Sequence, residues 1–403
     1  MRWIFRFAVL AYLALGSAVY GAPQQSFAQF LNEFEQKAVA AGIPKSVYRA
    51  VTKGLEADPS IKVAQGSQPE FEKPIWSYLD QRITADRIKR GRAAFAQNRQ
   101  LFERVGAAYG VDPYMLAAIW GVETDYGAIM SNDRYFKPVL RSLFSLVHQR
   151  RGRVKLDEAE LISALRIYAQ GEAPKGGLKG SWAGALGHLQ IMPGAFLTHG
   201  TDFDGDGKRD PHGSLGDALA SSAKWLLGIG YLPGQDWGYE VTLPNDFDYM
   251  LAGRTQFRPI SFFASRGVER VKSRAFGNTD ELVFLYVPAG ANGPKFLMTK
   301  NYLALKGYNF ADSYALAVAH LTDRLKGAGP FVDDWPRGAK FLNRQQRIEL
   351  QTKLTRLGFY NDKLDGRFGP ISQDALRQWQ IQNGQLADGF ATIEVYNRVM
   401  KSN

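Results

Sequence analysis

The sequence of 403 residues has no cysteine, and this absence excludes several kinds of protein at once. It rules out disulfides, zinc–thiolate sites, a cysteine nucleophile and the cysteine acceptor of a lipid anchor. The five histidines show no metal-ligand spacing, and neither a Gly-x-Ser-x-Gly elbow nor a phosphate loop occurs. The sequence therefore does not indicate a thiol enzyme, a serine hydrolase or a nucleotide-binding enzyme.

Acidic residues are fewer than basic residues. The chain has 50 Lys and Arg against 39 Asp and Glu, a formal net charge of +11, so acidic polymers are its natural partners. The basic residues are spread along the chain without a helix-turn-helix or finger pattern, which favours an anionic glycan or a general contribution to solubility over nucleic acid. With 45% hydrophobic and 13% aromatic residues, the chain can form two or three globular domains.

The first 22 residues have the pattern of a secretory leader. Arg2 and Arg6 flank the start of an apolar run at residues 7–20, and small residues precede Pro23. The run is too short for a stable membrane span, and the alternative is an uncleaved amphipathic anchor. We expect an exported protein of the periplasm, with no lipid anchor because cysteine is absent.

Residues 112–127 are predicted to form a short helix that carries a candidate catalytic acid. Asp112 can cap it, Pro113 suits its first turn and Gly127 offers a stop. Glu123 then ends an apolar stripe, where burial is expected to raise the pKa of its carboxyl and keep it protonated near neutral pH. A glycosidic bond needs such an acid to protonate its leaving oxygen. The alternative is a helix-end Glu that reaches solvent.

An Asp- and Gly-rich stretch at residues 202–210 matches the start of a calcium loop. Carboxylates stand at positions one, three, five and nine, with Gly207 at position six for the tight turn. Gly213 stands at position twelve in place of the usual acid, so water or a neighbour such as Asp217 has to complete the site. The alternative is a turn without metal. The predicted ligands are Asp202, Asp204, Asp206, Lys208 and Asp210.

The remaining pattern is mostly helical with a small β element. Helices are predicted near residues 27–34, 74–83, 88–105, 135–147, 157–168 and 302–325. A strand is predicted at residues 239–243 and a hairpin from residues 281–287 and 295–298. Gly and Pro at residues 327–336 indicate a linker to a small C-terminal domain. We predict a leader at 1–22, a catalytic region at 23–326, a linker at 327–341 and a final domain at 342–403.

Two motifs give the catalytic region a resemblance to a known family. Residues 121–127 read Gly-Val-Glu-Thr-x-x-Gly, and residues 181–193 form a second signature, in which His188 replaces the usual Gln. In this order they resemble the lytic murein transglycosylase B family. The resemblance implies an α+β, mostly helical fold with a lysozyme-like catalytic region, and Glu123 as the one catalytic Glu in a deep groove. Residues 350–399 resemble the three-helix peptidoglycan-binding domain.

The resemblance also implies substrate contacts. Ser181 and Gln190 are expected to line sugar subsites, and Arg150 and Arg151 to meet the glycan or its peptide. The residues that flank the Glu are expected to be Tyr308, Asn309 and Tyr314. Two further contacts, placed by spacing, are Tyr78 and Trp225.

The reaction that the resemblance implies is cleavage between N-acetylmuramic acid and N-acetylglucosamine without water. Glu123 would act as acid and then as base, giving a 1,6-anhydromuramyl end. Ordinary glycosidases use a second carboxylate, but Asp125 lies roughly 200° round the helix from Glu123. A hydrolytic muramidase and a non-enzymatic peptidoglycan-binding protein are the alternatives. Expected partners are glycan strands and proteins of cell-wall synthesis or remodelling. No catalytic cofactor is expected, only structural calcium.

Overall fold

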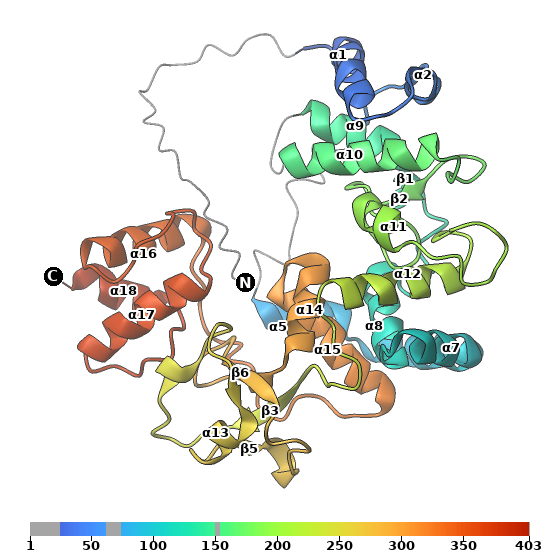
Figure 1. Cartoon of the computed structure of the whole chain (residues 1–403). Helices are drawn as coiled ribbons and strands as arrows, with labels where there is room; N and C mark the ends of the chain where they lie inside the picture. Colours follow the sequence, from blue (N-terminus) through green and yellow to red (C-terminus); the bar gives the residue numbers. More distant parts are fainter. Residues whose placement is uncertain (1–24, 62–73, 150–153, 403) are drawn as a thin grey trace, which may run out of the picture.

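The computed structural model of the chain describes residues 25–61, 74–149 and 154–402 (Figure 1). The predicted leader at residues 1–22 and the pair Arg150 and Arg151 lie outside these residues. Within the described ranges, none of the helices has the length and apolar character needed to cross a membrane. The expected α+β class, mostly helical with a small sheet, is confirmed.

The N-terminal helices pack on a pair of helices from the middle of the chain. In Figure 1, α1 and α2 (blue) lie against α9 and α10 (green). Phe30, Phe34 and Tyr48 from the first pair meet Phe144 of α9 edge to face in a buried aromatic cluster. The elements of this layer are α1 (Phe27–Ala40), α2 (Lys45–Thr52), α9 (Val139–His148), α10 (Val154–Ala169) and α11 (Pro193–His199).

A second and larger core surrounds one buried helix, α8 (Pro113–Thr124), which packs along α15 (Asp312–Lys326). The helix predicted at residues 88–105 is in fact two helices that meet at Asn98. The Asn98 side chain donates to the carbonyl of Ala94 at 2.9 Å, and the same carbonyl accepts from the Asn98 amide at 3.2 Å, so Asn98 caps the end of the first of these helices. The other helices of this layer are α5 (Ile75–Arg82), α6 (Ala85–Gln97), α7 (Arg99–Tyr109), α12 (Leu215–Gly228) and α14 (Lys300–Asn309).

The β element is an antiparallel sheet with strand order β4-β6-β7-β3-β5. The predicted hairpin is confirmed, because β6 and β7 pair directly with Leu285 opposite Leu297. The strands are β3 (Gly238–Thr242), β4 (Arg258–Pro259), β5 (Glu269–Arg270), β6 (Leu282–Tyr286) and β7 (Lys295–Met298). The short elements beside them are α13 (Ile260–Ala264) and the 3-10 turns η1 (Tyr249–Leu251) and η2 (Val271–Ser273). A separate two-stranded ladder joins β1 (Lys137–Pro138) to β2 (Lys179–Gly180).

The C-terminal domain is a three-helix module, as the resemblance implied. Its helices α16 (Arg344–Arg356), α17 (Pro370–Gln382) and α18 (Ile393–Lys401) enclose a core that includes Leu350, Leu376 and Trp379. Asn343 caps α16 by accepting from the backbone of Gln346, whose side chain accepts in return. The module therefore has a core of its own.

The module and the chain that leads to it are attached to the sheet region by specific contacts. The Arg377 guanidinium, 3% exposed, donates to the carbonyl of Ala252 at 3.3 Å. The Asp388 carboxylate accepts from the amide of Ala291 at 3.1 Å. Before the module, the buried Glu240 carboxylate accepts from the amides of residues 332 and 333 at 2.7 and 3.0 Å. The predicted linker is thus packed on the catalytic region.

Candidate active site

The helix that presents Glu123 is formed as predicted at its start. Asp112 accepts a hydrogen bond from the amide of Tyr114 at 2.9 Å, and Pro113 occupies the first turn. The helix is apolar nearly all round, and most of its residues between Met115 and Thr124 are buried. Burial on all sides gives α8 little freedom to move relative to α15.

The end of α8 differs from the prediction. The helix stops at Thr124, because Asp125 and Tyr126 take left-handed backbone conformations with φ of 52° and 60°. The Asp125 carboxylate is held by Arg87 at 3.2 Å and by Arg90 at 2.9 Å. Burial alone would raise the pKa of Asp125, but the hydrogen bonds from these two arginines outweigh burial and lower it. Asp125 is a counter-ion for α6.

The ring of Tyr126 locks this end of the helix against its neighbour. A Cβ at Gly91 would lie 2.1 Å from the Tyr126 oxygen, and one at Gly121 would lie 2.5 Å from the ring. Trp120 meets the same ring edge-on at 5.7 Å. Two glycines on facing helices are therefore needed to admit the ring.

Two tyrosines from α14 and α15 adjoin Glu123. The Tyr314 hydroxyl donates to Oε1 of Glu123 at 2.6 Å. The Tyr308 ring lies parallel to that of Tyr314 at 6.3 Å, and its hydroxyl donates to the carbonyl of Leu189 at 2.7 Å and lies 3.0 Å from Oγ of Ser222. Burial, followed by the nearby Glu123 charge, raises the pKa of both phenols, so both stay protonated donors.

His188, which stands where the family pattern has Gln, joins the second signature to α8 by hydrogen bonds. Trp120 Nε1 donates to His188 Nδ1 at 3.1 Å, and Thr124 Oγ1 donates to the His188 carbonyl at 2.7 Å. An indole N–H can only donate, so the ring proton of His188 is on Nε2. Burial, assisted by the charge of His212, lowers the pKa of His188 to about 4. The imidazole is therefore neutral at physiological pH.

Other predicted substrate residues shape their own loops in the structure. Gln190 has a φ of 53°, and its side chain donates to the carbonyl of Gly187 at 2.9 Å. Ser181 Oγ accepts from the amide of Ala185 at 3.1 Å. Both side chains thus hold the second signature in shape.

The remaining predicted contacts fall at different distances from the Glu. Tyr78 on α5 is 4% exposed and lies close enough to Tyr314 to raise the pKa of that phenol further. Asn309 ends α14. Trp225 packs on His199 at 5.2 Å in the other core. Arg150 and Arg151 lie outside the described residues. The structure therefore places Tyr308 and Tyr314 beside Glu123, and Tyr78 beside Tyr314.

Sequence reasoning missed three members of this site. Ser222 is fully buried beneath Tyr308, whereas a Ser pair in an amphipathic helix reads as a surface position. Trp120 and Thr124 were assigned no contact with the second signature, although both bond to residue 188. For Trp120 and Thr124, proximity to Glu123 in the sequence was the only available signal, and Ser222 had none.

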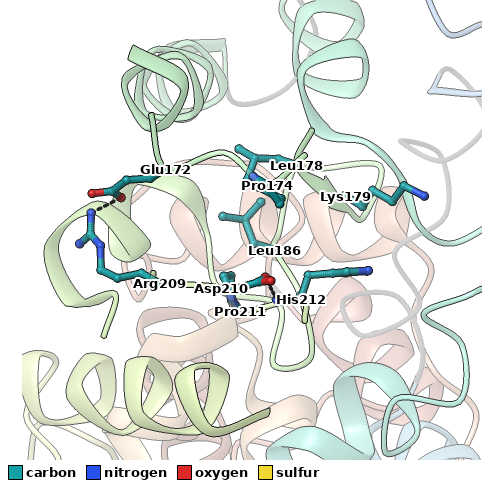
Figure 2. A pocket seen from close by; sticks show the side chains of 10 residues that line it. Glu172, Pro174, Leu178, Lys179, Leu186, Arg209, Asp210, Pro211 and His212 are labelled. Carbon is teal, nitrogen blue, oxygen red and sulfur yellow. Dashed lines mark hydrogen bonds and ion pairs between the residues drawn. The ribbon is translucent and has the colours of Figure 1, made fainter. Parts of the chain in front are cut away.

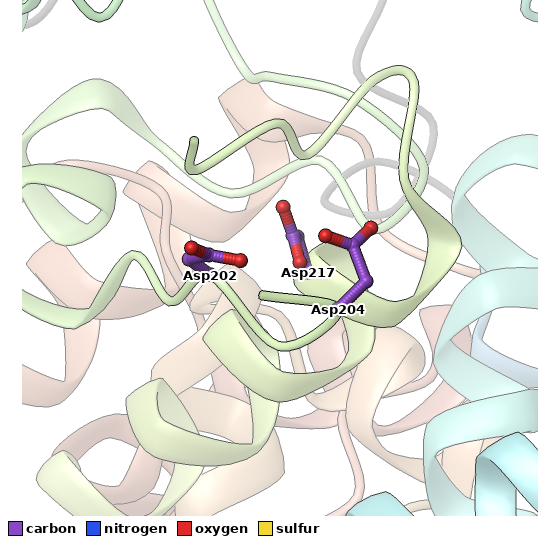
Figure 3. Close-up of side chains that lie close together, drawn as sticks. All are labelled: Asp202, Asp204 and Asp217. Atoms are coloured by element: carbon purple, nitrogen blue, oxygen red, sulfur yellow. The ribbon is translucent and has the colours of Figure 1, made fainter. Parts of the chain in front are cut away.

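The Asp loop brings three carboxylates together (Figure 3). Single oxygens of Asp202, Asp204 and Asp217 lie within 4.8 Å of one another. Burial raises the pKa of Asp217, although amides of residues 210 and 203 donate to it. Two other predicted ligands lie outside this group: Asp206 accepts from the amide of residue 208, and Asp210 from the amides of residues 212 and 213. Three converging carboxylates suit a hard divalent cation such as calcium.

The same loop supports the second signature from behind. A Cβ at Gly187 would lie 1.9 Å from the carbonyl oxygen of Pro211, so the two backbones touch. Beside this contact is a cavity of about 10 Å³, bordered by the Arg209–Glu172 ion pair and by His212 (Figure 2). His212 Nδ1 is buried there without a partner among the described residues. The volume is about that of one water-sized sphere.

Comparison with known protein families matches both parts of the chain. A family model described as a transglycosylase SLT domain matches residues 26–323, and one described as a putative peptidoglycan binding domain matches residues 343–399. The membrane-bound lytic murein transglycosylase B of Escherichia coli K12 is 28% identical over 249 residues. The match covers 60% of this chain and 65% of that relative, a little under two thirds of its length.

Solved structures extend the likeness to the whole fold. The crystal structure of SltB3 from Pseudomonas aeruginosa in complex with NAG-anhNAM-pentapeptide is 40% identical and covers 94% of this chain and 100% of that one, with a TM-score of 0.86. Slt35 from Escherichia coli in complex with calcium is 24% identical, covers 74% and 92% of the two chains, and has a TM-score of 0.60. The second likeness is one of fold.

Proposed function

The chain belongs to the transglycosylase SLT family, and from this premise we propose that it cleaves peptidoglycan glycan strands without water, with Glu123 as the only proton carrier. The bond cut is the β-1,4 bond between N-acetylmuramic acid and N-acetylglucosamine, and the product has a 1,6-anhydromuramyl end. The observation that carries the proposal is the 2.6 Å hydrogen bond from Tyr314 to Glu123. It orients one carboxyl at the end of a buried helix, where an acid catalyst needs a fixed position.

The hydrogen bond also assigns separate roles to the two carboxyl oxygens. Tyr314 remains a donor because burial raises the pKa of its phenol, so Oε1 of Glu123 accepts and the carboxyl carries its own proton on Oε2. That proton passes to the glycosidic oxygen as the C1–O bond breaks. The carboxylate then takes the proton of the muramyl C6 hydroxyl while this oxygen bonds to C1. Glu123 ends protonated, ready for the next cycle.

The surroundings of Glu123 favour the C6 hydroxyl over water as nucleophile. Asp125, the carboxylate nearest to Glu123 in the sequence, forms ion pairs with Arg87 and Arg90. It is therefore unsuited to activate water. The C6 hydroxyl belongs to the reacting sugar, so its effective concentration is high. The substrate N-acetyl group is the natural stabiliser of the cationic transition state.

Product analysis tests the proposal. Digestion of purified sacculi in oxygen-18 water is expected to give muramyl ends that are one water lighter than hydrolysis products and carry no label. Glu123→Gln is the control and should yield neither product. Reducing, labelled muramyl ends as the main product would make the enzyme a muramidase instead.

The Asp202, Asp204 and Asp217 cluster is proposed to hold a structural calcium ion. Three converging carboxylates, one of them with its pKa raised by burial, support this assignment. A cation there would stabilise the loop that contacts Gly187, and through it the second signature. No step of the reaction passes through this ion.

The C-terminal module is proposed to bind the wall, and the enzyme to work in the periplasm after export by its leader. SltB3 is a relative whose complexes contain a disaccharide with a pentapeptide, which supports strands that bear peptides as the substrate class. The contacts of Arg377 and Asp388 with the sheet region would fix the module relative to Glu123. Partnership with wall-synthesis proteins stays a prediction.

A further inference from the structure

A basic cleft lies between α6 and the last turn of α15, beside the catalytic helix. Its volume is about 350 Å³, and its lining residues are Ala85, Ile88, Lys89, Arg92 and Arg324. The four residues from α6 are spaced by three and four positions, so they share one face of that helix. Three of the five lining residues are cations and none is an acid.

These cations differ from the other basic residues of α6. Arg87 and Arg90, on another face, pair with Asp125. In the part of the chain that the structure describes, Lys89, Arg92 and Arg324 form no ion pair with a carboxylate. Their charges are therefore not neutralised within the fold.

The two guanidinium groups are also brought close together. Arg92 Nη2 donates to the carbonyl oxygen of Arg324 at 2.6 Å. Arg324 Nε is buried without an acceptor among the described residues. Burial, followed by the charge of Arg92, lowers the pKa of Arg324. The carbonyl end of α15 attracts cations, but Lys326 in the same turn has its own acid, Asp112, at 2.5 Å. An external oxyanion would relieve the repulsion that remains.

Resting on the proposed function, we propose that this cleft binds carboxylates of the peptide stem that hangs from a muramyl residue of the strand. A guanidinium pair and an ammonium group match carboxylates in charge and in hydrogen-bonding geometry. Ala85 is exposed and adds apolar surface beside the cations, whereas Ile88 is only 6% exposed. Arg324 lies ten positions after Tyr314 on α15, so the cleft is roughly 15 Å along that helix from the tyrosine that bonds to Glu123. An extended stem of five residues can span about that distance.

The first test compares peptide-bearing with peptide-free glycan strands, using the full-length Lys89→Gln/Arg92→Gln variant. KM for peptide-bearing strands should rise roughly three- to twentyfold at low salt, as expected for two exposed ion pairs, and the effect should shrink at high salt. The kcat and the cleavage of peptide-free strands should stay within twofold of wild type. The matched control is Arg104→Gln/Lys224→Gln, which removes two exposed charges elsewhere. It should leave KM unchanged for both substrates.

The second test changes the ligand. Strands whose stem carboxylates are amidated should bind wild type as weakly as the variant binds normal strands, and the variant should show no further loss. Arg324→Gln should raise KM for peptide-bearing strands as the double variant does, and its melting temperature is measured alongside. An unchanged KM for peptide-bearing strands, or an equal loss on peptide-free strands, would overturn the proposal. Continued formation of anhydromuramyl ends by all variants would leave the proposed function standing in either case.

Discussion

The Tyr314 hydroxyl lies 2.6 Å from Oε1 of Glu123, although 191 positions separate the two residues in the chain. The contact exists because α15 packs along α8 over most of its length, and both helices are buried. The Glu123 carboxyl, the proposed acid, is therefore positioned by the main hydrophobic core. Changes in that packing should affect turnover before they affect binding.

Removal of the Tyr314 hydroxyl should slow the chemical step. Tyr314→Phe leaves the ring in its core but removes a hydrogen bond to a carboxyl, which costs about 1.5 kcal/mol or more and corresponds to about a tenfold fall in kcat. KM and the melting temperature should change little. Steady-state kinetics on peptidoglycan fragments measures this. Tyr302→Phe is the control, since that hydroxyl bonds to Asp312 in the same core and should leave kcat unaltered. Equal kcat values for Tyr314→Phe and wild type would contradict the assigned role.

Loss of the Asp125 charge should destabilise the protein at neutral pH. The ion pairs hold the folded pKa of Asp125 below its usual value, so their contribution is fully present above the unfolded pKa of about 3.9 and is lost as pH falls through the folded pKa. Asp125→Asn should lower the free energy of unfolding by about 1–3 kcal/mol at pH 7.

Urea unfolding at pH 7 and pH 3 checks both parts of this prediction. The difference in the free energy of unfolding between Asp125→Asn and wild type should be smaller at pH 3 than at pH 7. Asp133→Asn, in an exposed loop, is the control and should show no gap at either pH. A gap of constant size at both values would mean that the charge of Asp125 does not matter.

Calcium should raise the melting temperature. A ligand that binds the folded state at a hundred times its Kd adds about 2.7 kcal/mol of stability. Melting in calcium and in chelator should differ for wild type, and Asp204→Ala should abolish the difference. The effect should weaken in acid, because burial raises the pKa of Asp217 and a protonated carboxyl no longer attracts the cation. Asp246→Ala, an exposed acid elsewhere, should retain the full difference. If the wild-type melting curves in calcium and in chelator superimpose, the loop is a turn without metal.

The position at which the chain is truncated should decide how stable the remaining catalytic region is. A chain that ends after Lys326 loses the amides of residues 332 and 333 that satisfy the buried Glu240 carboxylate, and the Phe331 ring that stacks on His320 at 3.8 Å. A chain that ends after Ala339 keeps both. The longer truncation product should melt near wild type and sediment less with sacculi, whereas the shorter should melt several degrees lower. Equal melting of the two, or undiminished sedimentation of the longer, would contradict the inferred contacts or the anchoring role.

The sequence alone determined the features that depend on short-range chemistry. The cap at Asp112, the early Pro113 and the apolar run after them define the start of α8. Two short apolar runs on either side of a Gly- and Pro-containing turn define the hairpin, and two motifs indicate the family. Each of these signals is contained within a few neighbouring residues, where capping and periodicity act.

Only the tertiary structure decided how those pieces meet. Gly127 looked like the end of the helix, but Arg87 and Arg90 stabilise a left-handed Asp125 and end it earlier. Asp206 stands in the calcium-loop pattern but lies outside the group of converging carboxylates, which Asp217 of the next helix forms with Asp202 and Asp204. Such contacts arise when burial of distant apolar faces brings charged and polar groups within bonding distance, and local sequence patterns carry no record of that distance.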